Sequence, residues 1–176
     1  MTEITIRDAA PADIPALHAL IESAYRGESS RAGWTTEADL LDGQRTDPDD
    51  LADILADPAQ ALLTAWRDDE LVGCILIADR GDGMGYFGML SIRPTLQGGG
   101  LGRRLVEAAH AALAERFGAR RVRISVLPQR ETLIAWYQRL GYQRTGETLP
   151  FPYGNPRFGL PKRDDLYFVV MEHGLA

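Results

Sequence analysis

A cluster of glycines that could bind an anion lies between an apolar segment and a long amphipathic run: Gly98, Gly99, Gly100 and Gly102. Glycine lets the backbone turn sharply and approach a ligand closely, because it has no Cβ in the way. The cluster opens a helix that we expect over residues 101–117, so unbonded N–H groups and the positive end of the helix dipole meet there. This arrangement favours an anion site, most naturally one for phosphate.

Two common phosphate-binding patterns do not fit the cluster. The Walker pattern requires Gly-Lys-Ser/Thr at the start of the helix, whereas Gly102 is followed by Arg103 and Arg104. The dinucleotide fingerprint G-x-G-x-x-G also fails, because a pattern that begins at Gly98 needs glycine at position 103. We expect Arg103, directly after the glycines, to contact an anionic cofactor, and Arg104 to be a solvated surface residue.

The pattern that does fit is Gln97-x-x-Gly100-x-Gly102, which stands between a strand that ends at Ile92 and the helix. It resembles the Q/R-x-x-G-x-G/A segment of the GCN5-related N-acetyltransferase (GNAT) superfamily, which holds the pyrophosphate of acetyl-CoA. The resemblance implies that the glycine loop binds the pyrophosphate through backbone N–H groups. It also implies that the end of the preceding strand offers backbone groups to the pantetheine amides. A tight strand-to-helix turn without a ligand is the alternative.

A second segment, which ends at Tyr142, resembles the N-x-x-A-x-x-x-Y-x-x-x-G-F/Y segment of the same superfamily. Tyr137, Gly141 and Tyr142 match it in spacing. Arg130 stands at the usual Asn and Leu133 at the usual Ala. The resemblance implies that Tyr137 is the general acid that protonates the departing thiolate, and that position 130 contacts the pantetheine arm. The alternative is that Tyr137 only fills the core beneath its helix.

Together the two segments imply a cofactor site, with acetyl-CoA as acyl donor, and one catalytic residue, Tyr137. The implied cofactor-binding residues are Leu90, Ser91, Ile92, Gln97, Gly98, Gly99, Gly100, Leu101, Gly102, Arg103 and Arg130. The first hypothesis is an acetyl-CoA-dependent N-acetyltransferase that transfers the acetyl group directly to a primary amine of a small molecule or protein. The second is a non-catalytic acyl-CoA-binding or regulatory domain on the same fold.

Apolar periodicity predicts the elements around these segments. Their order resembles the GNAT fold, an α/β (α+β) fold with a mixed, mostly antiparallel sheet of about seven strands flanked by helices. In that superfamily two central parallel strands splay apart and the cofactor lies in the gap. We expect a single domain over residues 1–176, with an acidic helical insertion over residues 27–57 and a loop rich in proline and aromatic residues over residues 149–165.

Composition and the N-terminal sequence argue against several classes of protein. A net charge of −6 argues against nucleic-acid binding, and no apolar run reaches membrane-spanning length. The N-terminus lacks the basic and apolar regions of a signal peptide. Cys74 is the only cysteine, so no internal disulfide can form, and the cytoplasm is the expected location. His18 has no second ligand at a convincing spacing, so we expect no metal site.

The acceptor site is expected where aromatic and acidic residues gather. In the acidic insertion, Trp34 and Glu37 could form a pocket for a cationic amine. Tyr153, in the proline-rich loop, is a third candidate. That loop could wall the acceptor site, form a homodimer contact or pack on its own core. The candidates for the general base are Glu22, Glu28 and Glu37, with ordered water as the alternative.

Overall fold

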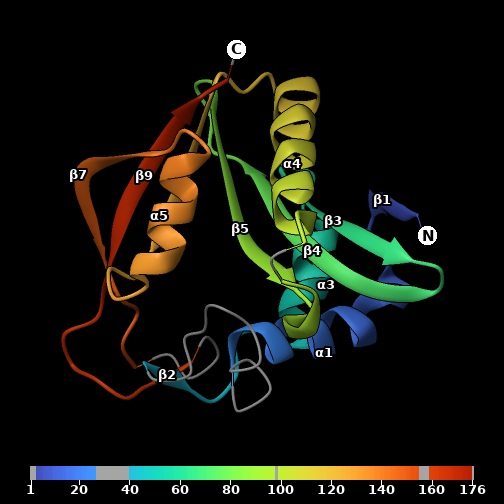
Figure 1. Ribbon diagram of the computed structural model, residues 1–176, viewed down its shortest axis with the longest axis horizontal. Helices are drawn as coiled ribbons and strands as arrows, with labels where there is room; N and C mark the ends of the chain where they lie inside the picture. Colours follow the sequence, from blue (N-terminus) through green and yellow to red (C-terminus); the bar gives the residue numbers. More distant parts are fainter. Residues whose placement is uncertain (1–2, 27–39, 98, 155–158, 176) are drawn as a thin grey trace.

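A seven-stranded sheet organises the fold, with its strands in the order β1-β3-β4-β5-β6-β9-β7 (Figure 1). The computed structural model describes residues 3–26, 40–97, 99–154 and 159–175. The strands are β1 (Ile4–Asp8), β3 (Gln60–Arg67), β4 (Glu70–Asp79), β5 (Met84–Ile92), β6 (Arg121–Val126), β7 (Gln143–Pro150) and β9 (Tyr167–Gly174). Neighbouring strands are antiparallel except β5 and β6, which are parallel. This confirms the predicted mixed, mostly antiparallel sheet.

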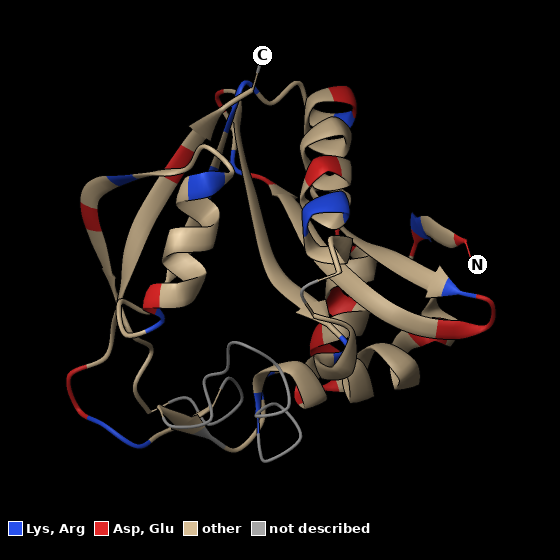
Figure 2. Ribbon diagram, viewed as in Figure 1, with Lys and Arg blue, Asp and Glu red and all other residues tan. Residues whose placement is uncertain are grey.

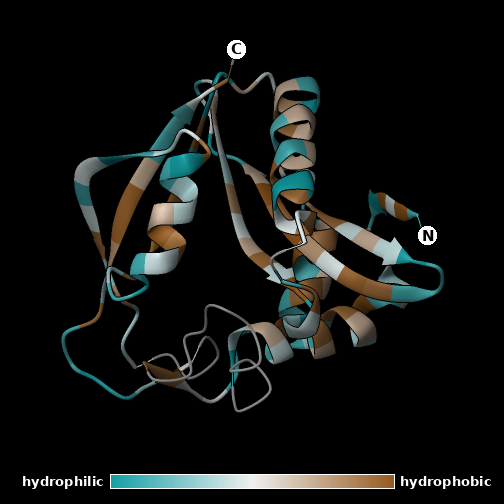
Figure 3. Cartoon of the chain, viewed as in Figure 1, coloured by the Kyte–Doolittle hydropathy of each residue, from teal (hydrophilic) through white to brown (hydrophobic). Residues whose placement is uncertain are grey.

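Helices cover both faces of the sheet. They are α1 (Ile14–Tyr25), α3 (Pro48–Ala56), α4 (Leu101–Phe117) and α5 (Glu131–Arg139), with short 3-10 helices at Pro11–Asp13 and Pro94–Leu96. Residues of α4 and α5 share one hydrophobic cluster with the sheet, and residues of α1 and α3 share another. Figure 3 shows the strands between these helices largely in hydrophobic colours. The core therefore consists of two layers, one on each face.

Local sequence signals set the ends of these elements. Asp47 caps α3, because its side chain accepts a hydrogen bond of 2.7 Å from the N–H of Asp50. Gly118 ends α4 with a φ of 65°, a left-handed value that glycine adopts without steric cost. β5 ends at Ile92, two residues before Pro94, which has no N–H to offer to the sheet. The start predicted for the helix at Leu101 is confirmed.

β4 lies deep in the sheet, with a neighbouring strand on each side and helices over both faces. It is buried without interruption from Leu71 to Ala78. Cys74 lies within this run, and burial raises the pKa of its thiol to about 12. The thiol therefore stays protonated near neutral pH, and a Cys74 nucleophile has no support from its surroundings.

The sheet opens in its middle, between its two parallel strands. β5 and β6 pair only where residues 84–86 run beside residues 121–123. Beyond them the two strands diverge, and Figure 1 shows β5 turning away from the half of the sheet that contains β9 and β7. The gap lies at the carboxyl ends of both strands, before the glycine loop in one case and before α5 in the other.

The structure contains a second, two-stranded sheet that the sequence did not predict. It pairs β2 (Leu41–Asp42) with β8 (Leu160–Pro161) and so joins the acidic insertion to the proline-rich loop. A small hydrophobic cluster includes residues of both segments: Leu40, Leu41, Leu127, Phe151 and Leu166. Strands of two residues have no periodicity to detect, and proline is typical of loops. Their pairing depends on contacts that only the folded chain brings together.

Two features are absent from the described part of the chain. None of its helices has the length and the apolar character needed to cross a membrane. No group of three or more His, Cys, Asp or Glu side chains within the described ranges is placed to hold a metal ion.

Candidate functional site

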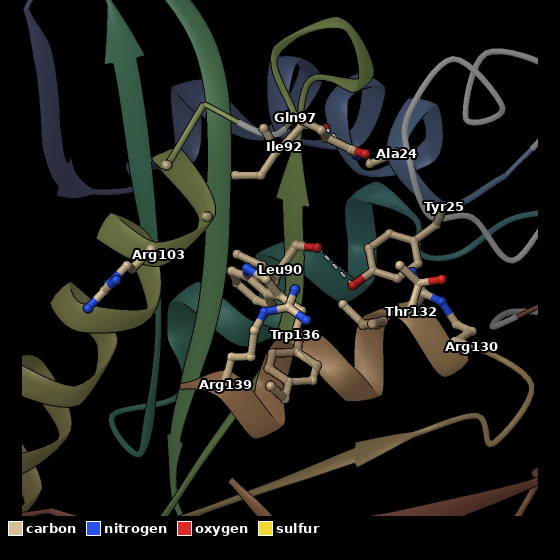
Figure 4. A pocket seen from close by; sticks show the side chains of 14 residues that line it. Ala24, Tyr25, Leu90, Ile92, Gln97, Arg103, Arg130, Thr132, Trp136 and Arg139 are labelled. Atoms are coloured by element: carbon tan, nitrogen blue, oxygen red, sulfur yellow. Dashed lines mark hydrogen bonds between the residues drawn. The ribbon is translucent and has the colours of Figure 1, made fainter. Parts of the chain in front are cut away.

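A pocket with a cavity volume of about 450 Å³ lies where the glycine loop, the end of β5 and α5 meet; it is termed the first pocket. Its lining residues are Ala24, Tyr25, Leu90, Ile92, Gln97, Gly100, Gly102, Arg103, Arg130, Thr132, Leu133, Trp136, Tyr137 and Arg139. Figure 4 shows Arg103 reaching from α4, and Trp136 and Arg139 from α5. The first pocket therefore lies at the opening of the sheet.

The glycine loop leaves space for a ligand to approach the backbone. Gly100 has a φ of 83°, and a Cβ added there would meet nothing within 4 Å. α4 begins at the next residue, and the first N–H groups of a helix have no partner within it. Open backbone and the positive end of a helix of 17 residues thus coincide, which is what an anion site requires.

Basic side chains surround this helix start. Arg103, Arg130 and Arg139 line the first pocket, and no Asp or Glu is among its described lining residues. Figure 2 shows basic segments at the beginning of α4 and near both ends of α5. Arg103 Nε lies 3.1 Å from Glu107 Oε1, but both side chains are exposed and such pairs are weak in water. The first pocket therefore offers positive charge to a ligand with phosphates.

The remaining lining of the first pocket is largely apolar. It includes Leu90, Ile92, Leu133 and Trp136. Trp136 lies against the start of α4, since a Cβ added at Gly102 would be 3.4 Å from its ring. A ligand with a phosphate group at one end and a long, mostly apolar arm matches this combination of linings.

β5 is irregular where it lines the pocket. Its pairing with β4 shifts between Cys74 and Leu76, and Met89 has a φ of 51°. A left-handed φ costs a residue with a side chain on the order of 1 kcal/mol, so contacts nearby must hold it. One such contact is the hydroxyl of Tyr25, which donates a hydrogen bond of 2.9 Å to the Leu90 carbonyl. The backbone is thus fixed where β5 leaves β6.

Tyr137 lies on α5 and is only 5% exposed. Its ring packs against those of Phe87 and Tyr142, with centroid distances of 5.8 and 5.9 Å. Burial raises the pKa of the Tyr137 hydroxyl well above its usual value; Tyr25 adds to this rise and Arg130 opposes it. The hydroxyl therefore keeps its proton near neutral pH.

A second pocket, with a cavity volume of about 260 Å³, adjoins the first. The two pockets share Tyr25, Leu90, Arg130, Leu133 and Tyr137. The other lining residues of the second pocket are Arg26, Leu41, Arg45, Tyr86, Phe87, Gly88, Met89, Ile124, Ser125, Val126, Leu127, Phe151, Pro152 and Phe168. Two reactants held in the two pockets would meet beside Tyr137, an arrangement suited to direct transfer between them.

Most of the cofactor residues expected from the sequence line the first pocket: Leu90, Ile92, Gln97, Gly100, Gly102, Arg103 and Arg130. The side chains of Ser91 and Leu101 are buried instead. The Ser91 hydroxyl donates to the Met89 carbonyl at 2.9 Å, and Leu101 belongs to the core cluster under α4. Gly99 is exposed outside this lining, and Gly98 lies outside the described residues.

The acceptor residues expected from the sequence are not brought together in the described part of the chain. Trp34 and Glu37 lie outside it. Tyr153 is 45% exposed and lines neither pocket. Its hydroxyl accepts a hydrogen bond of 2.7 Å from the N–H of Leu166 and donates one of 3.0 Å to the Arg163 carbonyl, so it stabilises the end of the proline-rich loop. The loop reaches the second pocket through Phe151 and Pro152.

Among the base candidates, Glu22 has a structural role. Its Oε1 accepts hydrogen bonds from the backbone N–H groups of Arg45, at 2.7 Å, and Thr46, at 2.9 Å. Glu28 and Glu37 lie outside the described residues. No Asp or Glu is among the described residues that line either pocket.

Three residues that line these pockets were not singled out from the sequence: Tyr25, Arg26 and Arg45. Tyr25 reads as the last apolar residue of the α1 stripe, and the two arginines read as ordinary surface charges. No motif or spacing marks them. They reach the site because the end of α1 and the segment before α3 pack beside β5 and α5.

Known proteins share sequence with this chain. Residues 17–142 match the Acetyltransferase (GNAT) family. The chain is 33% identical over 157 residues to a mycothiol acetyltransferase of Salinispora tropica, a similarity that covers 86% of this chain and 48% of that protein. The chain thus spans about half the length of this curated relative.

Solved structures share the fold. The ribosomal-protein-S18-alanine N-acetyltransferase of Escherichia coli matches with a TM-score of 0.72 at 14% identity, covering 99% of this chain and 95% of that one. yncA from Salmonella typhimurium, solved with its cofactor acetyl-CoA, matches with a TM-score of 0.68 at 20% identity, covering 98% and 94%. The family match spans both the glycine loop and the helix of Tyr137. The chain therefore belongs to the Acetyltransferase (GNAT) family.

Proposed function

We propose that this protein is an acetyl-CoA-dependent N-acetyltransferase, which transfers an acetyl group directly to a primary amine of a small molecule or protein. The observation that carries the proposal is the position of Tyr137, which lines both pockets and is buried where they adjoin. A non-catalytic acyl-CoA-binding domain would need only the first pocket. A second pocket beside a proton donor supports the enzyme instead.

The first pocket supports acetyl-CoA as the acyl donor. Backbone N–H groups at Gly100, Gly102 and Arg103 would hold the pyrophosphate, and Arg139 would add positive charge. Trp136 and its apolar neighbours would contact the pantetheine arm. When bound there, acetyl-CoA supplies a thioester carbonyl that an amine can attack.

The chain's own groups would then have two tasks. The second pocket would hold the amine beside Leu90 and Tyr137, so that the reaction becomes effectively unimolecular. Tyr137 would give its hydroxyl proton to the departing sulfur. The amine must be neutral to attack; because no described lining residue is a carboxylate, we propose that its proton leaves through water.

The organisation of the chain is part of the proposal. We propose one catalytic domain, since the insertion and the proline-rich loop pair through β2 and β8 beside the second pocket. A homodimer stays a prediction; large apolar side chains are exposed in and around the proline-rich loop, at Leu149, Tyr153, Leu160 and Tyr167. The cytoplasmic location also stays a prediction.

The test is a calorimetric titration with acetyl-CoA, with NAD and ATP as controls, followed by an amine panel in which the free CoA thiol is measured. We expect a Kd on the order of micromolar for acetyl-CoA alone and thiol release with at least one amine. Binding without turnover on any amine would favour the non-catalytic alternative. Absence of acetyl-CoA binding would refute the assignment of the first pocket.

A further inference from the structure

The second pocket carries cationic side chains and no described carboxylate. Arg26, Arg45 and Arg130 line it together with aromatic and aliphatic residues. Resting on the proposed function, we propose that the acceptor is a small-molecule amine that also bears a carboxylate on an apolar or aromatic body. The sequence pointed the other way, because the acidic insertion suggested a cationic acceptor.

Three described carboxylates of the insertion are engaged in structural contacts. Asp47 caps α3. Asp50 accepts a hydrogen bond of 2.6 Å from the Thr46 hydroxyl. Asp57 accepts from the N–H of Ala59 at 2.9 Å. None of these three carboxylates lines the second pocket. Their charge therefore stabilises the helix and the loops and does not set the sign of the pocket.

Arg45 is held in place by its backbone and its neighbour. Glu22 on α1 accepts hydrogen bonds from the N–H groups of Arg45 and Thr46, at 2.7 and 2.9 Å. Thr46 is fully buried, and its hydroxyl is bonded to Asp50 on α3. A side chain that starts from a fixed backbone loses less entropy when it binds a ligand. The position of Arg45 is thus prepared before any ligand arrives.

Two guanidinium groups lie against a single ring at the junction of the pockets. The Arg45 guanidinium carbon is 5.2 Å from the centroid of the Tyr25 ring, and that of Arg130 is 5.5 Å from the same centroid. Arg45 has no ion pair with a carboxylate of the described residues. Guanidinium groups bind carboxylates through paired, charge-assisted hydrogen bonds, so an anionic ligand could pair with Arg45.

Arg26 adds buried positive charge. It is 5% exposed and lines the second pocket but not the first. Its Nη1 donates to the Tyr25 carbonyl at 3.2 Å. A cation in a poorly solvated site acts strongly on nearby ligand charges. Arg26 therefore adds a cationic side chain to the lining of the second pocket, in addition to Arg45.

The rest of the second pocket suits an apolar body. Phe87, Leu127, Phe151 and Phe168 line it. Since the amine must lie beside Tyr137 where the pockets join, the carboxylate would extend toward Arg26 and Arg45, which line the second pocket and not the first. A cavity volume of about 260 Å³ is of a size for a small molecule. An aromatic or branched amino acid meets all three requirements.

The test compares acids with their matched amides. L-phenylalanine and L-leucine, each with its carboxamide, are titrated calorimetrically into protein saturated with free CoA and into the unloaded protein. We expect at least one acid to bind about tenfold or more tightly than its amide, and its kcat/KM with acetyl-CoA to exceed that of the amide by a similar factor. Equal or tighter binding of the amides, or no binding of any acid, would overturn the proposal.

Three variants locate the effect. Arg45→Gln should bring the ratio of acid to amide affinity close to one, whereas Arg45→Lys should keep a part of it. Arg144→Gln, an equal charge change at an exposed residue of β7 that lines neither of the two pockets, should leave the ratio as it is. A ratio that survives Arg45→Gln in a folded protein would refute the role of Arg45. If the parent protein does not bind acetyl-CoA but still binds the acids more tightly than their amides, only the proposed function is refuted.

Discussion

The hydroxyl of Tyr25, at the end of α1, donates a hydrogen bond of 2.9 Å to the backbone carbonyl of Leu90 in β5 (Figure 4). The two residues are 65 positions apart in the chain, and both line both pockets. The bond joins the end of α1, which lines the pockets, to β5, the strand that borders the gap in the sheet. It also holds the ring against which Arg45 and Arg130 lie.

Replacing Tyr25 by Phe should therefore distinguish the contribution of the hydrogen bond from that of the ring. The ring remains, but the Leu90 carbonyl loses its donor in a half-buried place, so we expect a loss of about 1 kcal/mol in the free energy of unfolding. Urea denaturation of the two proteins measures this directly. A variant as stable as the parent would show that water replaces the hydroxyl at no cost.

Tyr137→Phe should lower kcat by roughly 100-fold or more, the usual range for loss of a general acid. The affinity for acetyl-CoA should change much less, because the ring is kept. Tyr142→Phe is the matched control: Tyr142 is buried beside Tyr137, donates to or accepts from His110 Nε2 at 2.6 Å, and lines neither of the two pockets. If both variants reduce turnover equally, Tyr137 is only a core residue.

Gly100→Glu should strongly weaken acetyl-CoA binding, since it places a carboxylate where we expect the pyrophosphate. Gly118→Glu is its counterpart at the other end of α4: both glycines have positive φ, and a Cβ at either would meet nothing within 4 Å. Both variants should lose on the order of 1 kcal/mol of stability from backbone strain. Only Gly100→Glu should raise the calorimetric Kd, by about 100-fold; an equal effect at both positions would refute the loop assignment.

His110 should make the protein less stable in acid. Burial, with a contribution from His173, lowers the pKa of His110 from 6.5 to about 4, while Glu107 opposes the shift. Between those pH values the unfolded chain binds a proton that the folded chain does not, so stability falls as the pH falls from about 6.5 toward 4. Above pH 6.5 the histidine is neutral in both states and has no such effect.

His110→Gln keeps a polar group near the Tyr142 hydroxyl and removes the titration. Urea midpoints of the parent and the variant, measured near pH 7 and near pH 5, should show a smaller loss on acidification in the variant. An equal loss in both proteins would assign the acid sensitivity to other groups.

Much of the fold could be predicted because its signals are local. The alternating residues of β6, the cap at Asp47 and the glycine at position 118 each act within a few residues, and the elements begin and end close to where these signals place them. The loop around Gly100 and the helix of Tyr137 were found for the same reason, since each is a short run with fixed spacing. The roles assigned to them stay predictions.

The acceptor side of the site could not be predicted in the same way. Arg26 and Arg45 come from segments without a motif, and they reach one pocket only because Glu22 holds the backbone before α3 against α1. Under the proposal, the acidic composition of the insertion is a poor guide to the acceptor, because capping and loop contacts occupy Asp47 and other described carboxylates. Composition counts charges, but the direction of a side chain depends on tertiary packing.

The short pairing between β5 and β6 has a thermodynamic consequence. Only three residue pairs join the halves of the sheet at this point, so a ligand that fills the gap beyond Tyr86 would contact both halves at once. Such a ligand binds the folded chain and not the unfolded one, and at a hundred times its Kd it adds about 2.7 kcal/mol to the free energy of unfolding. The lifetime of the folded protein in a cell would then follow the supply of the proposed acyl donor.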